Sequence, residues 1–322
     1  MTRVLVTGGY GYIGGRLVQA LAADATFSVT IAGRLLRRSL PGVRATAVDW
    51  HNSASLDAAC RAQDAVVHLA AMNEPDCEKG PFLALQSNGL GTLRLLQAAQ
   101  SAGVRRFIYV STSKVFGTNP TGPIDEFSVP RPANHYSITH RLAEDYVLAA
   151  HDKGLLQGIV LRLSNSLGAP ADPDVNAWML IANDICRQAA TTKQIALRSS
   201  GLAWRNFVAM ADVVAAIRHA LTMSPDLLSD GLFHLGGPET LRIWDLALRI
   251  ARRADKMFEQ STKLERAAGQ STTAHRMFEW RTDKFCSTGW KTTTALDEEI
   301  DNTLKMCRNA FRPLPEIARG PF

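Results

Sequence analysis

Short apolar runs alternate with helical patterns through the first half of the chain. Each run is followed by a stretch whose apolar residues recur at helical spacing. The predicted strands are Arg3–Thr7, Ser28–Ala32, Arg44–Val48, Ala65–Leu69, Phe107–Ser111 and Gly158–Leu163. The most regular helical patterns span Phe82–Ser101 and Tyr136–His151. Because fully apolar strands alternate with helices, the sequence predicts an α/β fold with a doubly wound parallel sheet, covered by helices on both faces.

The pattern changes after Leu163. A stretch rich in Gly, Pro and Asp predicts a loop over Asn165–Asn176. It is followed by a predicted helix, Trp178–Ala190, and a predicted strand, Gln194–Arg198. The helix predicted over Ala211–Met223 and the strand predicted over Leu232–Leu235 then indicate a return to the main sheet. We therefore expect a larger domain formed by residues 1–163 and completed by 203–236, with a smaller lobe formed by 164–202 and 237–322.

A glycine-rich loop, Thr7–Gly14, joins the first predicted strand to the first predicted helix. Glycines at positions 8 and 11 allow a tight turn and a close backbone approach, and the glycine at 14 lets the helix pack against the strand. The free amides at the helix start then face a phosphate. This context predicts a dinucleotide-binding site, with the candidate contacts Gly8, Gly11, Tyr12, Ile13 and Gly14.

Composition narrows the classes of partner. The chain has 322 residues, 46% of them hydrophobic, which is enough to build the core of one large domain and a smaller lobe. The formal charge of +6 is spread along the chain without a dense basic run, so we expect no nucleic-acid partner. A basic balance suits an anionic cofactor and an anionic substrate, although an ordinary solvated surface explains it equally well.

The five cysteines are dispersed and show no metal-ligand spacing, so we expect no metal and a reducing compartment. A strand already occupies the first residues, which leaves no room for a signal peptide, and no apolar run has the length of a membrane span. The sequence therefore predicts a cytoplasmic protein without a membrane partner.

Two further segments, Tyr109–Gly117 and Tyr136–His140, make the assignment more specific. Together with the glycine loop they resemble the extended branch of the short-chain dehydrogenase/reductase superfamily, whose members are mostly nucleotide-sugar epimerases, dehydratases and reductases built on a Rossmann fold. The resemblance runs almost end to end. Other matching segments occur in the family's order: Val67–Ala71, Asn88–Thr92, Arg162–Asn165, Trp204–Val208 and Thr288–Lys291.

The family's chemistry is hydride transfer coupled to proton transfer, which needs a base and a hydrogen-bonding partner for the substrate oxygen. The resemblance assigns these roles to Tyr136 and Thr112. A free phenol has a pKa of about 10, and the family lowers it with a lysine one helical turn further on. Here that position is His140, whose ordinary pKa of about 6.5 leaves it mostly uncharged at neutral pH.

Three alternatives follow from His140. It works as an imidazolium beside the cofactor phosphates, or the reaction needs little phenolate, or the protein has lost turnover and kept binding.

The residues at the end of the second predicted strand indicate whether NAD or NADP is preferred. Enzymes that use NAD usually carry an acidic residue there, but this chain reads Ile31-Ala32-Gly33-Arg34. Arg34, with Arg37 or Arg38, can clasp a 2′-phosphate, so the sequence favours NADP over NAD unless these arginines form a solvated loop. The resemblance implies further cofactor contacts at Asp49, Trp50, Leu69, Ala70, Ala71, Asn88, Tyr136, His140 and Ser164. Asp49 could instead cap the next helix.

The reaction type depends on Thr112-Ser113-Lys114. Sugar dehydratases of the family carry Thr-Asp-Glu there, and the two carboxyl groups move the protons that eliminate water. Their absence disfavours a dehydratase. Lys114 then meets an anionic group of the substrate or only solvent.

The resemblance implies substrate contacts at Met72, Thr112, Ser113, Lys114, Asn165, Trp178 and Arg205. For Arg205 the alternative is a structural ion pair, and for Trp178 it is core packing.

The sequence thus predicts an NADP-dependent epimerase or 4-keto reductase acting on a nucleotide-diphospho-sugar. Two alternatives stay open: a dehydrogenase or reductase of a non-nucleotide alcohol or ketone, and a non-catalytic NADP-binding regulator. The resemblance also implies a homodimer built on the helices predicted over Phe82–Ser101 and Tyr136–His151. Four apolar residues could serve that interface or the sheet: Leu93, Leu96, Leu142 and Val147.

Overall fold

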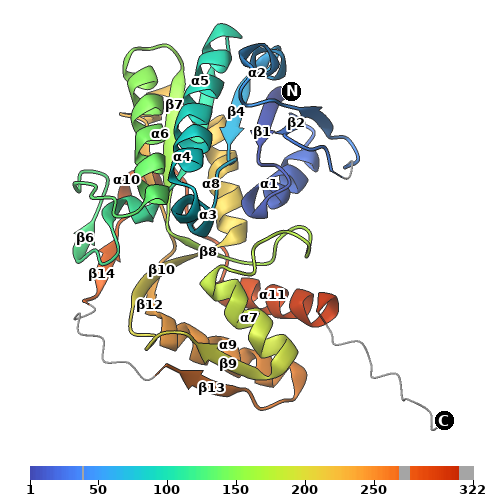
Figure 1. The fold of residues 1–322 in the computed structure, drawn as a ribbon, viewed down its shortest axis with the longest axis vertical. Helices are drawn as coiled ribbons and strands as arrows, with labels where there is room; N and C mark the ends of the chain where they lie inside the picture. The colour runs from blue at the N-terminus through green and yellow to red at the C-terminus, as the bar shows by residue number, and fades with distance from the viewer. Residues whose placement is uncertain (38–39, 268–275, 312–322) are drawn as a thin grey trace, which may run out of the picture.

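A seven-stranded parallel sheet forms the centre of the larger domain in the computed structural model, which describes residues 1–37, 40–267 and 276–311 (Figure 1). The strand order is β11-β7-β5-β4-β1-β2-β3. The strands are β1 (Thr2–Thr7), β2 (Phe27–Gly33), β3 (Arg44–Ala47), β4 (Ala65–His68), β5 (Arg106–Thr112), β7 (Gln157–Leu163) and β11 (Leu232–Leu235). The chain runs from β1 to one edge and then from β4 to the other. This confirms the predicted doubly wound sheet and places its switch point between β1 and β4.

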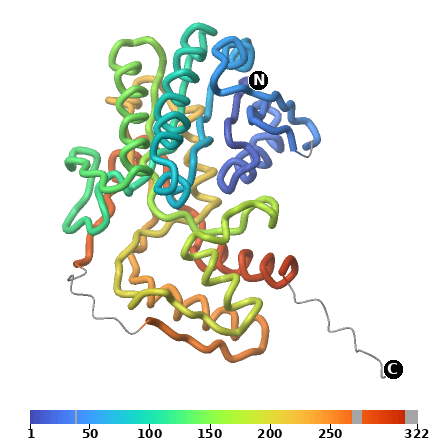
Figure 2. The backbone as a smooth tube through the Cα atoms, in the orientation of Figure 1, coloured from blue at the N-terminus to red at the C-terminus, as the bar shows by residue number. Residues whose placement is uncertain are grey.

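Helices cover both faces of this sheet (Figures 1 and 2). Because successive side chains of a strand point to opposite faces, Val4 and Leu5 of β1 enter two different cores. Val4 packs with α1 (Tyr12–Ala22) and α8 (Met210–Thr222). Leu5 packs in the core that contains α2 (Ser53–Cys60), α5 (Gly91–Ser101) and α6 (His135–Asp152). Burial on both faces explains why the inner strands read as apolar runs, whereas the edge strand β3 is mostly exposed.

The helix predicted over residues 82–101 contains a π-helical turn. α4 (Pro81–Ala84) continues into the π-helix η1 (Leu85–Leu90) and then into α5. The wider turn contains the buried Asn88, whose Oδ1 accepts a hydrogen bond of 2.8 Å from the backbone N–H of Met72. The π-turn therefore fixes the loop that follows β4 at the carboxyl edge of the sheet.

The smaller lobe has its own core below the main sheet in Figure 1. Its three-stranded sheet has the order β12-β10-β8, and a second sheet pairs β13 with β9. The strands are β8 (Asn165–Leu167), β9 (Gln194–Leu197), β10 (Trp204–Ala209), β12 (Glu239–Arg242) and β13 (Lys263–Arg266). Three helices, α7 (Ile181–Thr192), α9 (Ile243–Phe258) and α11 (Leu296–Ala310), pack in this core.

Several expectations for the second half need correction. Residues 165–167 form β8 inside the stretch predicted as a loop, and α7 begins at Ile181 instead of residue 178. β10 does not complete the main sheet, because it pairs with β8 and β12, so the return to that sheet is made by α8 and β11. Phe285 and Trp290, expected in the smaller lobe, pack in the core of the larger domain.

The remaining short elements lie at the edges of these layers. They are α3 (Glu74–Lys79), the 3₁₀ turns η2 (Ser113–Phe116) and η3 (Pro225–Leu227), α10 (Asp283–Cys286), and the paired strands β6 (Gly122–Ile124) and β14 (Phe278–Trp280).

Candidate active site

The glycine loop after β1 is packed tightly against the end of β4. Gly8 has a φ of +69°, and a Cβ there would lie 2.9 Å from the backbone nitrogen of Ala70. A Cβ on Gly14 would lie 2.1 Å from the carbonyl oxygen of Gly8, so the start of α1 can approach the loop only with glycine. Within the described residues no side chain caps α1, whose N-cap is Gly11. Its first backbone N–H groups are therefore available to an anion.

Thr7 fixes the loop after β4. Its Oγ1 accepts hydrogen bonds of 3.2 Å from the backbone N–H groups of Leu69 and Ala70 and lies 2.6 Å from Nδ1 of His68. Burial lowers the pKa of His68 to about 3, so this buried link is neutral. The segment Leu69–Ala71 thus stands at the switch point, beside the glycine loop.

Thr112 and Tyr136 meet at the carboxyl end of β5. Thr112 is the last residue of that strand, and Tyr136 is the second residue of α6. Asn134 caps α6 by accepting a hydrogen bond of 2.9 Å from the backbone N–H of Ser137. Burial and the negative charge of Glu74 raise the pKa of Tyr136 to about 12, while the nearby polar side chain of Thr112 opposes the rise. The two expected catalytic residues therefore face each other, with the phenol protonated in the free protein.

His140 lies one helical turn after Tyr136, and its side chain is 3% exposed. The ring centroids of the two residues are 4.3 Å apart. Nδ1 of His140 lies 2.7 Å from the hydroxyl of Tyr109, whereas Nε2 has no hydrogen-bond partner within the described ranges. Burial lowers the pKa of His140 to about 4, so the imidazolium alternative is the one that the structure disfavours.

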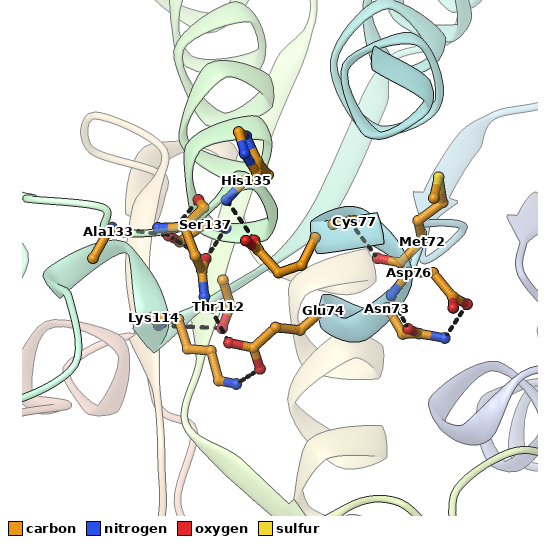
Figure 3. Close-up of polar contacts among 12 residues, drawn as sticks. Met72, Asn73, Glu74, Asp76, Cys77, Thr112, Lys114, Ala133, His135 and Ser137 are labelled. Carbon is orange, nitrogen blue, oxygen red and sulfur yellow. Dashed lines mark hydrogen bonds and ion pairs between the residues drawn. The ribbon is translucent and has the colours of Figure 1, made fainter. Parts of the chain in front are cut away.

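Sequence reasoning missed Glu74, which begins α3. Its Oε1 accepts a hydrogen bond of 2.6 Å from the side chain of Asn134, and its Oε2 pairs with Nζ of Lys114 (Figure 3). The backbone N–H of Lys114 donates in turn to Oγ1 of Thr112, at 3.2 Å. Asn73 followed by Glu74 and Pro75 is a recognisable helix start. The partners of Glu74, however, lie 40 and 60 residues away in sequence, so only the fold reveals them.

The candidate substrate residues divide into those at the site and those elsewhere. Arg205 of β10 is partly buried, and its pKa is lowered by burial and raised by the nearby charge of Glu74. Asn165 donates a hydrogen bond of 3.1 Å to the carbonyl oxygen of Asn206. Ser113 and Met72 follow β5 and β4 and are partly exposed. Of these residues, Arg205 is tied to the site through the charge of Glu74, and Ser113 directly follows Thr112.

Trp178 is a core residue instead of a substrate contact. It is 8% exposed and packs in the core of the smaller lobe, where its ring meets Phe311 edge to face. Its indole N–H donates a hydrogen bond of 2.8 Å to the carbonyl oxygen of Pro173. Its polar atom is thus already paired within the chain, which decides between the two sequence-based alternatives.

The candidate cofactor residues beyond the glycine loop line the same edge of the sheet. Arg34 and Arg37 are exposed after β2, and Arg38 lies outside the described residues. The exposed Asp49 accepts a hydrogen bond of 2.9 Å from the backbone N–H of His51, whereas Asn52 is the residue that caps α2.

The side chains of three further expected cofactor contacts, Trp50, Tyr12 and Ile13, already have contacts within the chain. The Trp50 ring lies 5.9 Å from that of His68, and the Tyr12 hydroxyl donates to the carbonyl oxygen of Gly168 at 3.0 Å. Ile13 packs against the core of the larger domain. A contact of Tyr12 and Ile13 with an anion would therefore use their backbone N–H groups.

Comparison with known proteins decides the family. The model of the NAD dependent epimerase/dehydratase family matches residues 4–236, which is more than half of the chain. The chain belongs to this family. The family's enzymes depend on NAD(P), in agreement with the glycine loop and the Thr112–Tyr136 pair.

Some similar proteins match nearly the whole length of this chain. A dTDP-D-glucose 4,6-dehydratase from Mus musculus is 25% identical over 96% of this chain and 89% of its own length. The structure of the UDP-glucose 4-epimerase from Thermus thermophilus, in complex with NAD, matches with a TM-score of 0.81 and 25% identity over 96% of this chain and all of that chain. RMD from Pseudomonas aeruginosa, complexed with NADPH, shares the fold with a TM-score of 0.79 and 23% identity over 96% of this chain and all of that chain.

The residues of this family member fit a dinucleotide. The uncapped start of α1 offers backbone N–H groups to a pyrophosphate. Within the described ranges, Nε2 of His140, which packs against Tyr136, and Oγ of Ser164, which follows β7, are buried without a hydrogen-bond partner. Buried polar atoms are normally paired, so these two suit the hydroxyl and amide groups of a nicotinamide riboside.

Across residues 1–37, 40–267 and 276–311, no cluster of His, Cys, Asp and Glu could hold a metal ion. In the same part of the chain, the helices are too short or too polar to cross a membrane.

Proposed function

We propose that this family member is an epimerase or 4-keto reductase of a nucleotide-diphospho-sugar and that it uses NADP. The observation that carries the proposal is the pairing of Thr112 with Tyr136 beside a glycine loop, in a chain that has Ser113 and Lys114 where dehydratases carry two carboxyl groups. Hydride and proton transfer at a single carbinol carbon need a tyrosine and a hydroxyl partner of this kind. They do not need the two carboxyl groups with which dehydratases eliminate water.

Tyr136 is the residue that moves the proton. As the hydride leaves the carbinol carbon, the phenolate oxygen of Tyr136 takes the hydroxyl proton, and the same proton returns when the carbonyl is reduced. Thr112 holds the substrate oxygen by a hydrogen bond. A bound nicotinamide supplies the group that accepts and returns the hydride. The position of Tyr136 at the N-terminus of α6 favours its anionic form, because the helix dipole is positive there.

Arg205 and Asn165 are proposed to hold the diphosphate. Arg205 lies partly buried at an edge where a guanidinium loses hydration, and burial lowers its pKa. A diphosphate restores the lost interactions, because two phosphate oxygens match the planar fork of arginine. This contact would orient the sugar toward Tyr136.

The test uses the purified full chain with UDP-glucose, dTDP-glucose and their 4-keto derivatives. An epimerase converts the sugar to its C4 epimer with no net change in NADPH, whereas a 4-keto reductase consumes NADPH in proportion to product. Proton NMR identifies the sugar product, and nicotinamide absorbance follows the cofactor. A 4-keto-6-deoxy product would replace the proposal with a dehydratase. NADPH binding without turnover or a thermal shift on any of these sugars would favour a regulator.

A further inference from the structure

Lys114 stands over the catalytic tyrosine. Its Nζ lies 5.9 Å from the centroid of the Tyr136 ring. Its backbone N–H donates to Oγ1 of Thr112, so Thr112 fixes the backbone position of Lys114. The turn η2, which contains Lys114, directly follows Thr112 at the end of β5.

Glu74 opposes this ammonium group. Figure 3 shows the side chains of Glu74 and Lys114 pointing toward each other beside Thr112. The other carboxylate oxygen of Glu74 accepts a hydrogen bond from the side chain of Asn134, which is the N-cap residue of α6. The Lys114 side chain is 43% exposed and that of Glu74 is 34% exposed, so both can change partners when a ligand arrives.

Position 140 cannot supply a positive charge in this protein. His140 is enclosed between Tyr109 and Tyr136, and burial keeps its imidazole neutral. A phenol that must lose a proton near neutral pH needs a stabilising charge from another element.

We propose that the Lys114–Glu74 ion pair controls the ionisation of Tyr136, with Lys114 supplying the positive charge that position 140 lacks and Glu74 attenuating it. The inference rests on the proposed function only in taking Tyr136 as the group that moves the proton. It makes Lys114 an electrostatic positioning residue in a place where the sequence offered only a substrate contact or a solvated side chain.

Groups from four elements face Tyr136, and their contributions have known signs. They are Glu74 and Cys77 of α3, Tyr109 and Thr112 of β5, Lys114 of η2, and His140 of α6 itself. Burial raises the pKa of the Cys77 and Tyr109 groups, so both are neutral at ordinary pH, as is His140. The formal charges that remain beside the phenol are those of Glu74 and Lys114, which act on it in opposite directions, and Arg205 of β10 lies close enough to act on Glu74.

Removal of Glu74 should therefore leave the ammonium of Lys114 unopposed. At 5.9 Å, the distance from Nζ of Lys114 to the Tyr136 ring centroid, one charge shifts a pKa by about half a unit to two units for an effective dielectric constant between that of a protein surface and water. Glu74→Gln keeps the shape of the side chain and an oxygen for Asn134. We expect it to lower the pKa of Tyr136 by an amount in this range.

The experiment is an ultraviolet absorbance titration of the tyrosines in the full chain without substrate. The signal of Tyr136 is obtained in each background by subtracting the titration of the same protein with Tyr136→Phe. Three proteins carry the test: Glu74→Gln, Glu74→Gln with Lys114→Met, and Glu74→Gln with Lys114→Arg. A lysine ordinarily loses its proton at about pH 10.4, whereas an arginine stays charged throughout the titration. The expected result is therefore the lowest pKa of Tyr136 in the third protein, a smaller lowering in the first, and the highest value of the three in the second.

Two charge-matched variants serve as controls. Asp145→Asn removes a carboxylate from α6 that pairs with Arg141, and Lys79→Met removes an exposed ammonium from α3. Melting temperatures establish that each variant is folded. The proposal is overturned if Glu74→Gln shifts the titration no more than Asp145→Asn. It is also overturned if adding Lys114→Met to Glu74→Gln changes the titration no more than adding Lys79→Met does.

The titration separates this inference from the proposed function. A shift that depends on Lys114 supports the inference even if no nucleotide sugar is turned over. Turnover of a nucleotide sugar with an unshifted titration overturns the inference and leaves the proposed function in place.

Discussion

The hydroxyl of Tyr109 lies 2.7 Å from Nδ1 of His140, which ties strand β5 to helix α6 inside the larger domain. The two rings are also stacked, with centroids 5.8 Å apart. This bond fixes the imidazole so that Nε2 is left without a partner among the described residues. Because burial lowers the pKa of His140 and raises that of Tyr109, the two form a neutral hydrogen-bonded pair at the position where the family carries a charged lysine.

The first prediction concerns stability in acid. The pKa of His140 is lowered to about 4, so between that value and its ordinary 6.5 the unfolded chain binds a proton that the folded chain does not. The contribution is fully present above about pH 6.5 and is lost as the pH falls toward about 4, by about 1.4 kcal/mol per pH unit. Urea unfolding of wild type and His140→Gln across this range measures the slopes. We expect the variant's slope to be smaller by about one proton, and equal slopes would contradict a buried neutral His140.

The second prediction concerns the proton-transfer residue. Tyr136→Phe removes the hydroxyl that faces Thr112 while keeping the ring against His140. Turnover should fall by about 10²-fold or more, because general acid–base catalysis contributes on that scale. NADPH binding, measured by nicotinamide fluorescence, should stay within a few-fold of wild type. Full activity of Tyr136→Phe would mean that another group moves the proton.

The third prediction concerns cofactor choice. Arg34 is exposed directly after β2, and no carboxylate stands at that strand end. Arg34→Ala should weaken NADP binding by on the order of 1.5–3 kcal/mol, the cost of one charged hydrogen-bonding partner, and leave NAD binding nearly unchanged. Isothermal titration with both cofactors gives the ratio of dissociation constants. A ratio that stays the same would show that the arginines beyond β2 form only a solvated loop.

The fourth prediction concerns assembly. Of the four residues expected at the interface, Leu96 and Val147 are buried in the domain core, whereas Leu93 and Leu142 are partly exposed. The exposed set is Phe82, Leu83, Leu85 and Leu90 of the α4–η1 segment with Ile138 of α6. We expect the wild-type protein to be a homodimer by light scattering at micromolar concentration, and Phe82→Asp to be a monomer.

Phe127→Asp is the matched control for this test, because Phe127 is 83% exposed and Phe82 is 85% exposed, and Phe127 lies outside these helices. A monomeric wild-type protein, or equal dissociation by both variants, would rule out this interface.

The sequence was sufficient where a function depends on residues that are close together along the chain. The loop from Thr7 to Gly14 carries both its turn and its helix start in one segment, and the structure places it as expected against β4. The inner strands of the main sheet were readable for the same reason, because burial on both faces makes them largely apolar, whereas the edge strand β3 is mostly exposed. Tyr136 and Thr112 were found by their resemblance to a family whose fold brings them together.

Only the tertiary structure decided how distant residues act on one another. The partners of Glu74 come from η2 and from the start of α6, and the position of β10 depends on pairing with strands from two other parts of the chain. The charge state of His140 also belongs to this class, since it is set by how deeply β5 and α6 enclose the ring. Sequence patterns report local conformation and burial, whereas pairing, desolvation and charge–charge distance arise only when the elements pack.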